Sequence, residues 1–128
     1  MLKEFKIFQV KKDLIDADLQ PHLLDAFFDN MMNGTEQSAF ALAVNNTYKF
    51  VAWINASDLD GVFRASNMGH EDQVVRFAKM HSLSVGDIIQ DDQGSIWICS
   101  SFGFEEANSL DGYIRKSFAE STYEEVGA

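Results

Sequence analysis

The sequence has few of the features that mark secreted or membrane-spanning proteins. Cys99 is its single cysteine, so no internal disulfide can form, which fits a reducing compartment. It contains no run of 18 apolar residues, and its N-terminus lacks the apolar stretch and small-residue cleavage site of a signal peptide. We therefore expect a cytoplasmic protein that makes no contact with a membrane.

Basic residues are also scarce. Ten Lys and Arg stand against twenty Asp and Glu, which gives a net charge of -10. The last third is the most acidic, because residues 81–128 hold nine acids and two bases. Nucleic-acid binding depends on Lys and Arg that displace counterions, so we expect no direct binding to DNA or RNA. The acidic balance indicates either solubility or attraction to a basic partner.

Side chains suited to metal binding or catalysis form no recognised pattern. His70, His81 and Cys99 are separated by 11 and 18 residues, which matches no zinc site with paired close ligands. The glycines form neither a dinucleotide-binding motif nor a P-loop. We expect no metal and no cofactor. A Cys99 nucleophile activated by a histidine remains open, although an Ile-Trp-Ile-Cys strand favours a buried, inert thiol.

Large apolar side chains are abundant and predict a folded domain. Hydrophobic residues make up 46% of the 128 residues, including eleven Phe, two Trp and three Tyr. A chain of this length removes roughly two thirds of its unfolded surface from water on folding. One domain is therefore expected.

A helix is predicted over residues 18–33. Four apolar residues recur there at i, i+3, i+4 and i+7, which is typical of an amphipathic helix that faces its own core: Leu24, Phe27, Phe28 and Met31. Asp18 is suited to cap this helix, Pro21 is tolerated in its first turn, and Asn33-Gly34 is suited to end it.

The remaining periodicity predicts an α+β fold, with a small antiparallel β-sheet and two or three helices packed on one face. The expected strands cover residues 5–10, 39–45, 48–56, 86–90 and 95–100, and the further helices cover 58–66 and 109–119. Residues 39–44 also fit a helix, and residues 74–79 fit either a strand or an irregular segment. Ser57 and Ser109 are the expected helix caps.

The most informative stretch is 81–104. Two β runs flank Asp91-Asp-Gln-Gly94, a four-residue turn whose final glycine is expected in the left-handed conformation. Phe102-Gly-Phe104 follows and is expected to form a bend packed on the core. The stretch therefore predicts a hairpin scaffold.

This stretch and the segment before it carry a family resemblance. His81-Ser-Leu-Ser-Val-Gly-Asp87, the acidic-glycine turn, Trp97 and Ser101-Phe-Gly-Phe104 resemble the YodL-like domain and related small proteins of phages and plasmids. The preceding strand and helix are similar to those of short phage relatives. The recognised resemblance covers residues 50–105, flanked by an N-terminal extension, 1–47, and a C-terminal helix and tail, 106–128. It implies a mobile-element setting and supplies no catalytic residues.

Two non-catalytic functions follow. In the first, an acidic face docks on the basic, nucleic-acid-binding surface of a host protein, as an inhibitor or modulator in host takeover or anti-defence. Its expected residues are Asp87, Asp91, Asp92, Glu105, Glu106 and Asp111. In the second, an assembly protein uses an apolar patch of Trp97, Phe102 and Phe104, or self-associates into a homo-oligomer through a sheet edge. A small enzyme that uses Cys99 or His81 is the third and weakest alternative.

Overall fold

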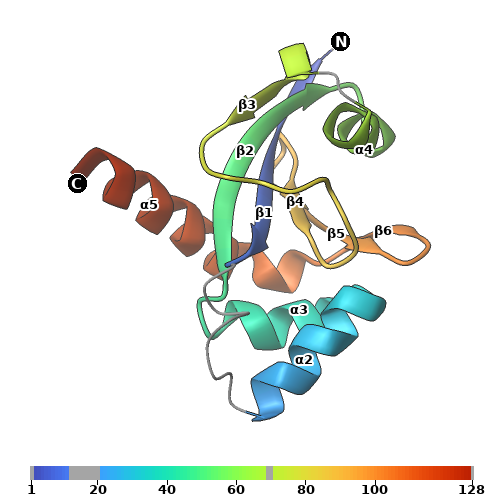
Figure 1. Cartoon of the computed structure of the whole chain (residues 1–128), viewed down its shortest axis with the longest axis vertical. Helices are drawn as coiled ribbons and strands as arrows, with labels where there is room; N and C mark the ends of the chain where they lie inside the picture. Colours follow the sequence, from blue (N-terminus) through green and yellow to red (C-terminus); the bar gives the residue numbers. More distant parts are fainter. Residues whose placement is uncertain (1, 12–20, 69–70, 128) are drawn as a thin grey trace.

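The computed structural model describes residues 2–11, 21–68 and 71–127, and it contains a six-stranded antiparallel sheet (Figure 1). The strand order is β3-β2-β1-β4-β5-β6. The strands are β1 (Lys3–Val10), β2 (Tyr48–Ala56), β3 (Val74–Arg76), β4 (Ile88–Gln90), β5 (Ile96–Ser100) and β6 (Gly103–Glu106). β1 lies inside the sheet between β2 and β4, so the N-terminal segment is part of the core rather than an appendage.

The α+β class is confirmed, but the expectation that the helices pack on one face is wrong, because helices cover both faces of the sheet. They are α2 (Pro21–Met32), α3 (Glu36–Ala43), α4 (Leu59–Asn67) and α5 (Asp111–Gly127), with short 3-10 turns at Glu71–Gln73 and Asn108–Leu110. α2, α3 and α5 pack on one hydrophobic core, and α4 packs on a second core across the sheet. None of the described helices is long and apolar enough to cross a membrane.

A β-bulge lets β2 serve both cores. Ile7 pairs with Ala52 while Phe8 pairs with Phe50, so Val51 is the extra residue in β2. The bulge shifts the in-out alternation by one position. Phe50 therefore points into the first core, and Val51 and Ala52 belong to the second.

The expected strand over residues 39–45 is wrong, because this segment forms α3. Thr35 and Ser38 form a capping box, in which each side chain accepts a hydrogen bond from the backbone N–H of the other residue. The buried residues Ala39, Leu42 and Ala43 then repeat at helical spacing. The cap and this spacing together select a helix where the apolar run alone fitted a strand.

Two expected caps are also wrong. Asp58, not Ser57, caps α4, and its carboxylate accepts a hydrogen bond from Gly61 N at 2.8 Å. Ser109 lies in the 3-10 turn before α5, where its N–H and hydroxyl donate to the Glu36 carboxylate. Asp18 lies outside the described residues. Asn33-Gly34 ends α2 as expected, with Gly34 at φ +63°.

The β4–β5 hairpin is confirmed, and Gly94 has the expected positive φ, +87°. The bend expected at Phe102-Gly-Phe104 is wrong in two respects. Gly103 and Phe104 belong to β6, which pairs with β5 and forms one edge of the sheet. Phe102 is 99% exposed rather than packed on the core.

The apolar stripe of α2 does not face the core as expected. Phe27 is partly buried, but Leu24, Phe28 and Met31 are exposed. The buried face carries Asn30, whose side-chain amide donates to Tyr48 Oη at 2.7 Å. A polar network therefore sets the rotation of this helix.

Candidate functional site

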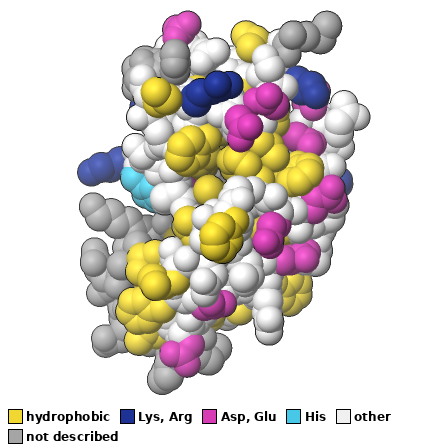
Figure 2. All heavy atoms as spheres, turned by 90° about the vertical axis from the view of Figure 1, so that its right-hand side faces the viewer, with side chains coloured by type: hydrophobic (Ala, Val, Ile, Leu, Met, Phe, Trp, Pro, Cys, Tyr) yellow, Lys and Arg dark blue, Asp and Glu magenta, His cyan; other side chains and the backbone are white. Residues whose placement is uncertain are grey.

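A hollow of about 480 Å³ opens beside the β4–β5 turn, between the start of β1, the N-terminus of α4 and β6. We call it the acidic hollow. Its apolar wall consists of Phe5, Leu59, Trp97 and Phe104, and its carboxylates belong to Asp58, Asp60, Asp91 and Asp92. Lys3 is its single cation. Figure 2 shows hydrophobic side chains (yellow) and carboxylates (magenta) side by side on one face of the molecule.

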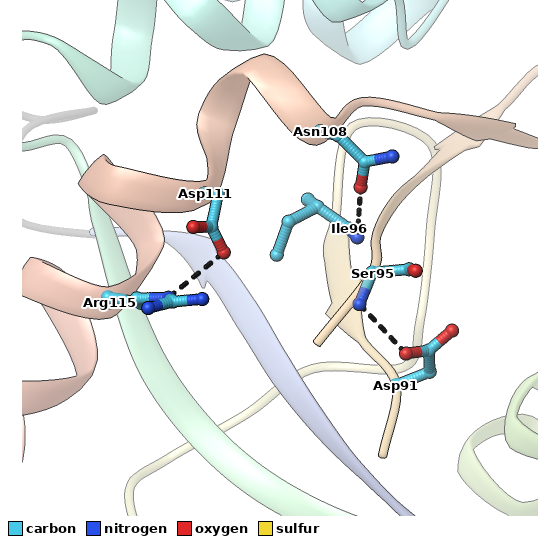
Figure 3. Close-up of polar contacts among 6 residues, drawn as sticks. All are labelled: Asp91, Ser95, Ile96, Asn108, Asp111 and Arg115. Carbon is cyan, nitrogen blue, oxygen red and sulfur yellow. Dashed lines mark hydrogen bonds and ion pairs between the residues drawn. The ribbon is translucent and has the colours of Figure 1, made fainter. Parts of the chain in front are cut away.

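Local structure fixes two of these carboxylates. Asp91 Oδ1 accepts a hydrogen bond from Ser95 N at 2.9 Å (Figure 3). The same oxygen accepts from Gln93 N at 3.0 Å. Asp91 Oδ2 accepts from Trp97 Nε1 at 3.0 Å, which orients the indole ring. Asp58 is held by its capping bond in α4. Asp91 and Asp58 are therefore held in place by hydrogen bonds to the backbone of their own turn and helix.

The structure brings some of the expected site residues together and separates others. Asp91 and Asp92 from the expected acidic face join Trp97 and Phe104 from the expected apolar patch in the acidic hollow. Glu105 and Glu106 are exposed on β6, and successive strand residues point to opposite sheet faces.

Asp111 and Phe102 lie apart from the hollow. Asp111 forms an ion pair with Arg115 Nε at 3.1 Å within the first turns of α5 (Figure 3). Phe102 stands free at the β5–β6 turn. The expected acidic face and the expected apolar patch therefore overlap in the acidic hollow, but neither Asp111 nor Phe102 lines it.

The placement of Asp87 on a solvated acidic face is wrong, because its side chain is only 4% exposed. Its Oδ2 accepts hydrogen bonds from Gln9 Nε2 and Ser84 N, both at 2.9 Å. Burial raises the pKa of Asp87 from its ordinary 3.8 to about 7, and the hydrogen bond from Ser84, the charge of His81 and the bond from Gln9 oppose that rise only in part. Asp87 therefore exchanges a proton near neutral pH.

Asp87 lies in the wall of a second cavity of about 540 Å³, which we call the Asp87 pocket. It opens between α2, the ends of β1 and β2 that meet there, and the segment that leads into β4. A buried network supports it. Tyr48 Oη donates to Gly86 O at 2.7 Å, and Asn30 Nδ2 donates to Tyr48 Oη at the same distance. Burial raises the pKa of Tyr48, so its hydroxyl stays protonated and remains a donor.

Gly86 is required by this arrangement. Its φ is +93°, and a Cβ there would lie 2.7 Å from Asn30 Nδ2. The turn that leads into Asp87 therefore closes around the buried side-chain amide of Asn30 in α2.

Among the described residues, the surroundings of Cys99 do not favour the enzyme alternative. Cys99 is buried, and burial raises its pKa to about 11, which keeps the thiol protonated and weakly nucleophilic. His81 Nδ1 lies 2.7 Å from Ser82 O. His70 lies outside the described residues. Across residues 2–11, 21–68 and 71–127, no three His, Cys, Asp or Glu side chains gather where they could hold a metal ion.

Sequence reasoning missed the contributors to both cavities that come from distant segments. Lys3, Phe5, Asp58 and Asp60 join the hollow only because β1 and the start of α4 meet the β4–β5 turn in space. Asp58 did carry a local signal, since an acid before a short amphipathic run is a standard helix cap. Gln9 and Asn30 carried none, because an isolated amide within an apolar strand or helix indicates no particular partner.

Comparison with known proteins identifies the family. The family model of the YodL-like domain matches residues 4–109. No curated protein and no solved structure matches the chain. The family match extends beyond residues 50–105, where the resemblance was recognised, and includes β1, α2 and α3. Because the match covers most of its 128 residues, the chain belongs to the YodL-like domain family.

Proposed function

We propose that this protein is a non-catalytic accessory protein that binds a basic surface of a host protein through the acidic hollow. One observation carries the proposal: carboxylates from two distant segments converge around a half-buried aromatic wall. An ordinary solvated acidic surface has no such wall. The combination suits a partner segment that presents Lys or Arg together with an apolar side chain.

The energetics favour such a partner. Four carboxylates against one ammonium give the hollow a net charge of -3, which speeds encounter with a basic surface at low salt. The apolar wall adds affinity that salt does not screen, at about 25 cal/mol per Å² of apolar surface removed from water. β6, as an edge strand, also leaves backbone groups for an extended segment to pair with.

The target class is a host protein that handles nucleic acid. Rigid carboxylates can occupy places that phosphates fill on such a protein, and the overall charge of -10 opposes direct binding of DNA or RNA. The phage and plasmid setting implied by the family resemblance supports a role in host takeover or anti-defence, in the cytoplasm of the host. The raised pKa of Cys99 supports a role without a thiol nucleophile.

A paired-variant capture experiment tests the proposal. The hollow variant D58N/D60N/D92N removes three charges, and Asn retains the α4 cap. The control variant E4Q/D25N/D72N removes three exposed charges elsewhere. A host protein captured by the wild type and the control, and lost with the hollow variant, supports the proposal if salt and duplex DNA release it. Equal capture by all three forms, or salt-insensitive binding alongside bound DNA, contradicts it.

A second candidate is an assembly role through self-association. It is favoured by the 99% exposure of Phe102 beside the β6 edge. Sedimentation of the wild type and of Phe102→Ser tests it. An oligomer that dissociates on this substitution and survives D58N/D60N/D92N supports self-association, whereas a monomer at all concentrations contradicts it.

A further inference from the structure

The Asp87 pocket has the size and lining of a small-molecule site. Its volume, about 540 Å³, lies in the range that holds small organic ligands. Six apolar side chains contribute to its wall: Val10, Phe27, Met31, Val51, Met80 and Val85. The pocket is separate from the acidic hollow, with which it shares no lining residue.

Its charge is opposite to that of the protein as a whole. Lys49 and Lys79 both line it, and neither forms an ion pair with a carboxylate in the described part of the chain. Lys49 stands opposite Gln9 in the β1–β2 register, which places it on the same sheet face as the amide that bonds Asp87. In a chain of net charge -10, two lysines over an apolar cavity form a local site for an anion.

Asp87 adds a hydrogen-bonding group to the inner wall. The carboxyl group of Asp87 accepts two hydrogen bonds, from Gln9 Nε2 and from Ser84 N, and both reach Oδ2. No fully buried polar side-chain atom of the described residues lacks a partner. The second oxygen, Oδ1, accepts neither of these bonds and is not fully enclosed, so it is the carboxyl atom that remains for a ligand donor in the pocket that Asp87 lines.

We propose that the Asp87 pocket binds a small organic anion with an apolar body. The body lies against Phe27, Met31 and Met80, and the acidic group lies between Lys49 and Lys79. A hydroxyl or N–H of the ligand donates to Asp87 Oδ1. This inference is independent of the proposed function, because neither its residues nor its probe involves the acidic hollow.

The test uses anilinonaphthalene sulfonate, whose fluorescence rises when its aromatic body enters an apolar site, and phenylnaphthylamine, which lacks the sulfonate. Wild-type protein is expected to bind one sulfonate probe per chain. K49Q/K79Q is expected to weaken that binding about tenfold, which corresponds to about 1.4 kcal/mol, and to leave the uncharged probe unaffected. The matched control R64Q/K116Q also removes two positive charges and is expected to leave both probes unaffected.

Further variants separate the pocket from other apolar surfaces. Phe28→Ser alters the exposed face of α2 at a residue that does not itself line the pocket, although its ring packs edge-on against Phe27, which does. Loss of binding in Phe28→Ser with retention in K49Q/K79Q overturns the proposal, because the probe then adsorbs to that face. Absence of saturable binding by the folded wild type also overturns it, as does one probe per dimer. If K49Q/K79Q fails to fold, the single substitution Lys79→Gln at an exposed position is expected to weaken binding of the sulfonate probe but not of the uncharged probe. If Lys79→Gln causes no such selective loss, the proposal is overturned.

Discussion

Replacing Asp87 with Asn should stabilise the protein, and the gain should grow with pH. The fold raises the pKa of Asp87 from 3.8 to about 7, so the native state holds the proton more tightly than the unfolded chain. The stability contributed by the neutral carboxyl is therefore complete below about pH 4 and is lost as pH rises to about 7. Above that pH the native state retains a buried carboxylate.

The magnitude follows from that difference in pKa. At 1.36 kcal/mol for each pKa unit, the raised pKa of Asp87 lowers the free energy of unfolding by about 4 kcal/mol at pH 8 and by about 1.5 kcal/mol at pH 5, relative to a group with its ordinary pKa. An Asn side chain keeps an oxygen that accepts from Gln9 Nε2 and Ser84 N, the two donors that now reach Oδ2. The stabilisation by D87N should therefore rise by about 2.5 kcal/mol between these pH values.

Urea unfolding of both proteins at a series of pH values measures this difference. Comparing the two proteins removes most of the contribution that other ionisable groups make to the pH dependence. The exposed Asp92→Asn serves as a control for the removal of one surface carboxylate. A pH-independent effect of D87N, or a wild type more stable than D87N at about pH 8, would refute the reasoning.

Two other predictions concern the glycines and the cysteine. Gly86→Ala should lower the free energy of unfolding by about 3 kcal/mol, because the new Cβ would lie 2.7 Å from Asn30. Gly94→Ala should lower it by about 1 kcal/mol, because only the positive φ of Gly94 opposes the substitution. Equal losses in urea unfolding would contradict this. Native Cys99, buried and with its pKa raised to about 11, should react with iodoacetamide far more slowly than in urea, and equal rates would contradict its burial.

The sequence was sufficient for elements whose signals are local. The β4–β5 hairpin follows from a glycine-ended turn between two strand-forming runs, and Gly94 adopts the expected conformation. α3 shows the limit of this reasoning, because its alanine-rich run fits either period, and a Thr35–Ser38 capping box decides for the helix. Periodicity also misjudged α2, whose buried face is set by the distant Tyr48 and Gly86 rather than by its own apolar stripe.

The candidate site was partly predictable for the same reason. Asp91, Asp92, Trp97 and Phe104 come from one hairpin and its neighbouring strand, so their proximity is encoded locally. Asp58 and Asp60 reach them only through the sheet order, which places β1 between β2 and β4. Asp87 was misplaced because an acid at a turn usually faces water. Only the structure reveals that Gln9 crosses from β1 to bind it.

The binding role of the acidic hollow can be tested by mapping amide chemical shifts of labelled protein during titration with a peptide of alternating Arg and Leu. The account predicts that the changes concentrate in residues 57–60, 91–93 and 103–104 and disappear in D58N/D60N/D92N, while E4Q/D25N/D72N retains them. Changes spread evenly over all exposed acids, or a map that persists in the hollow variant, would contradict the account.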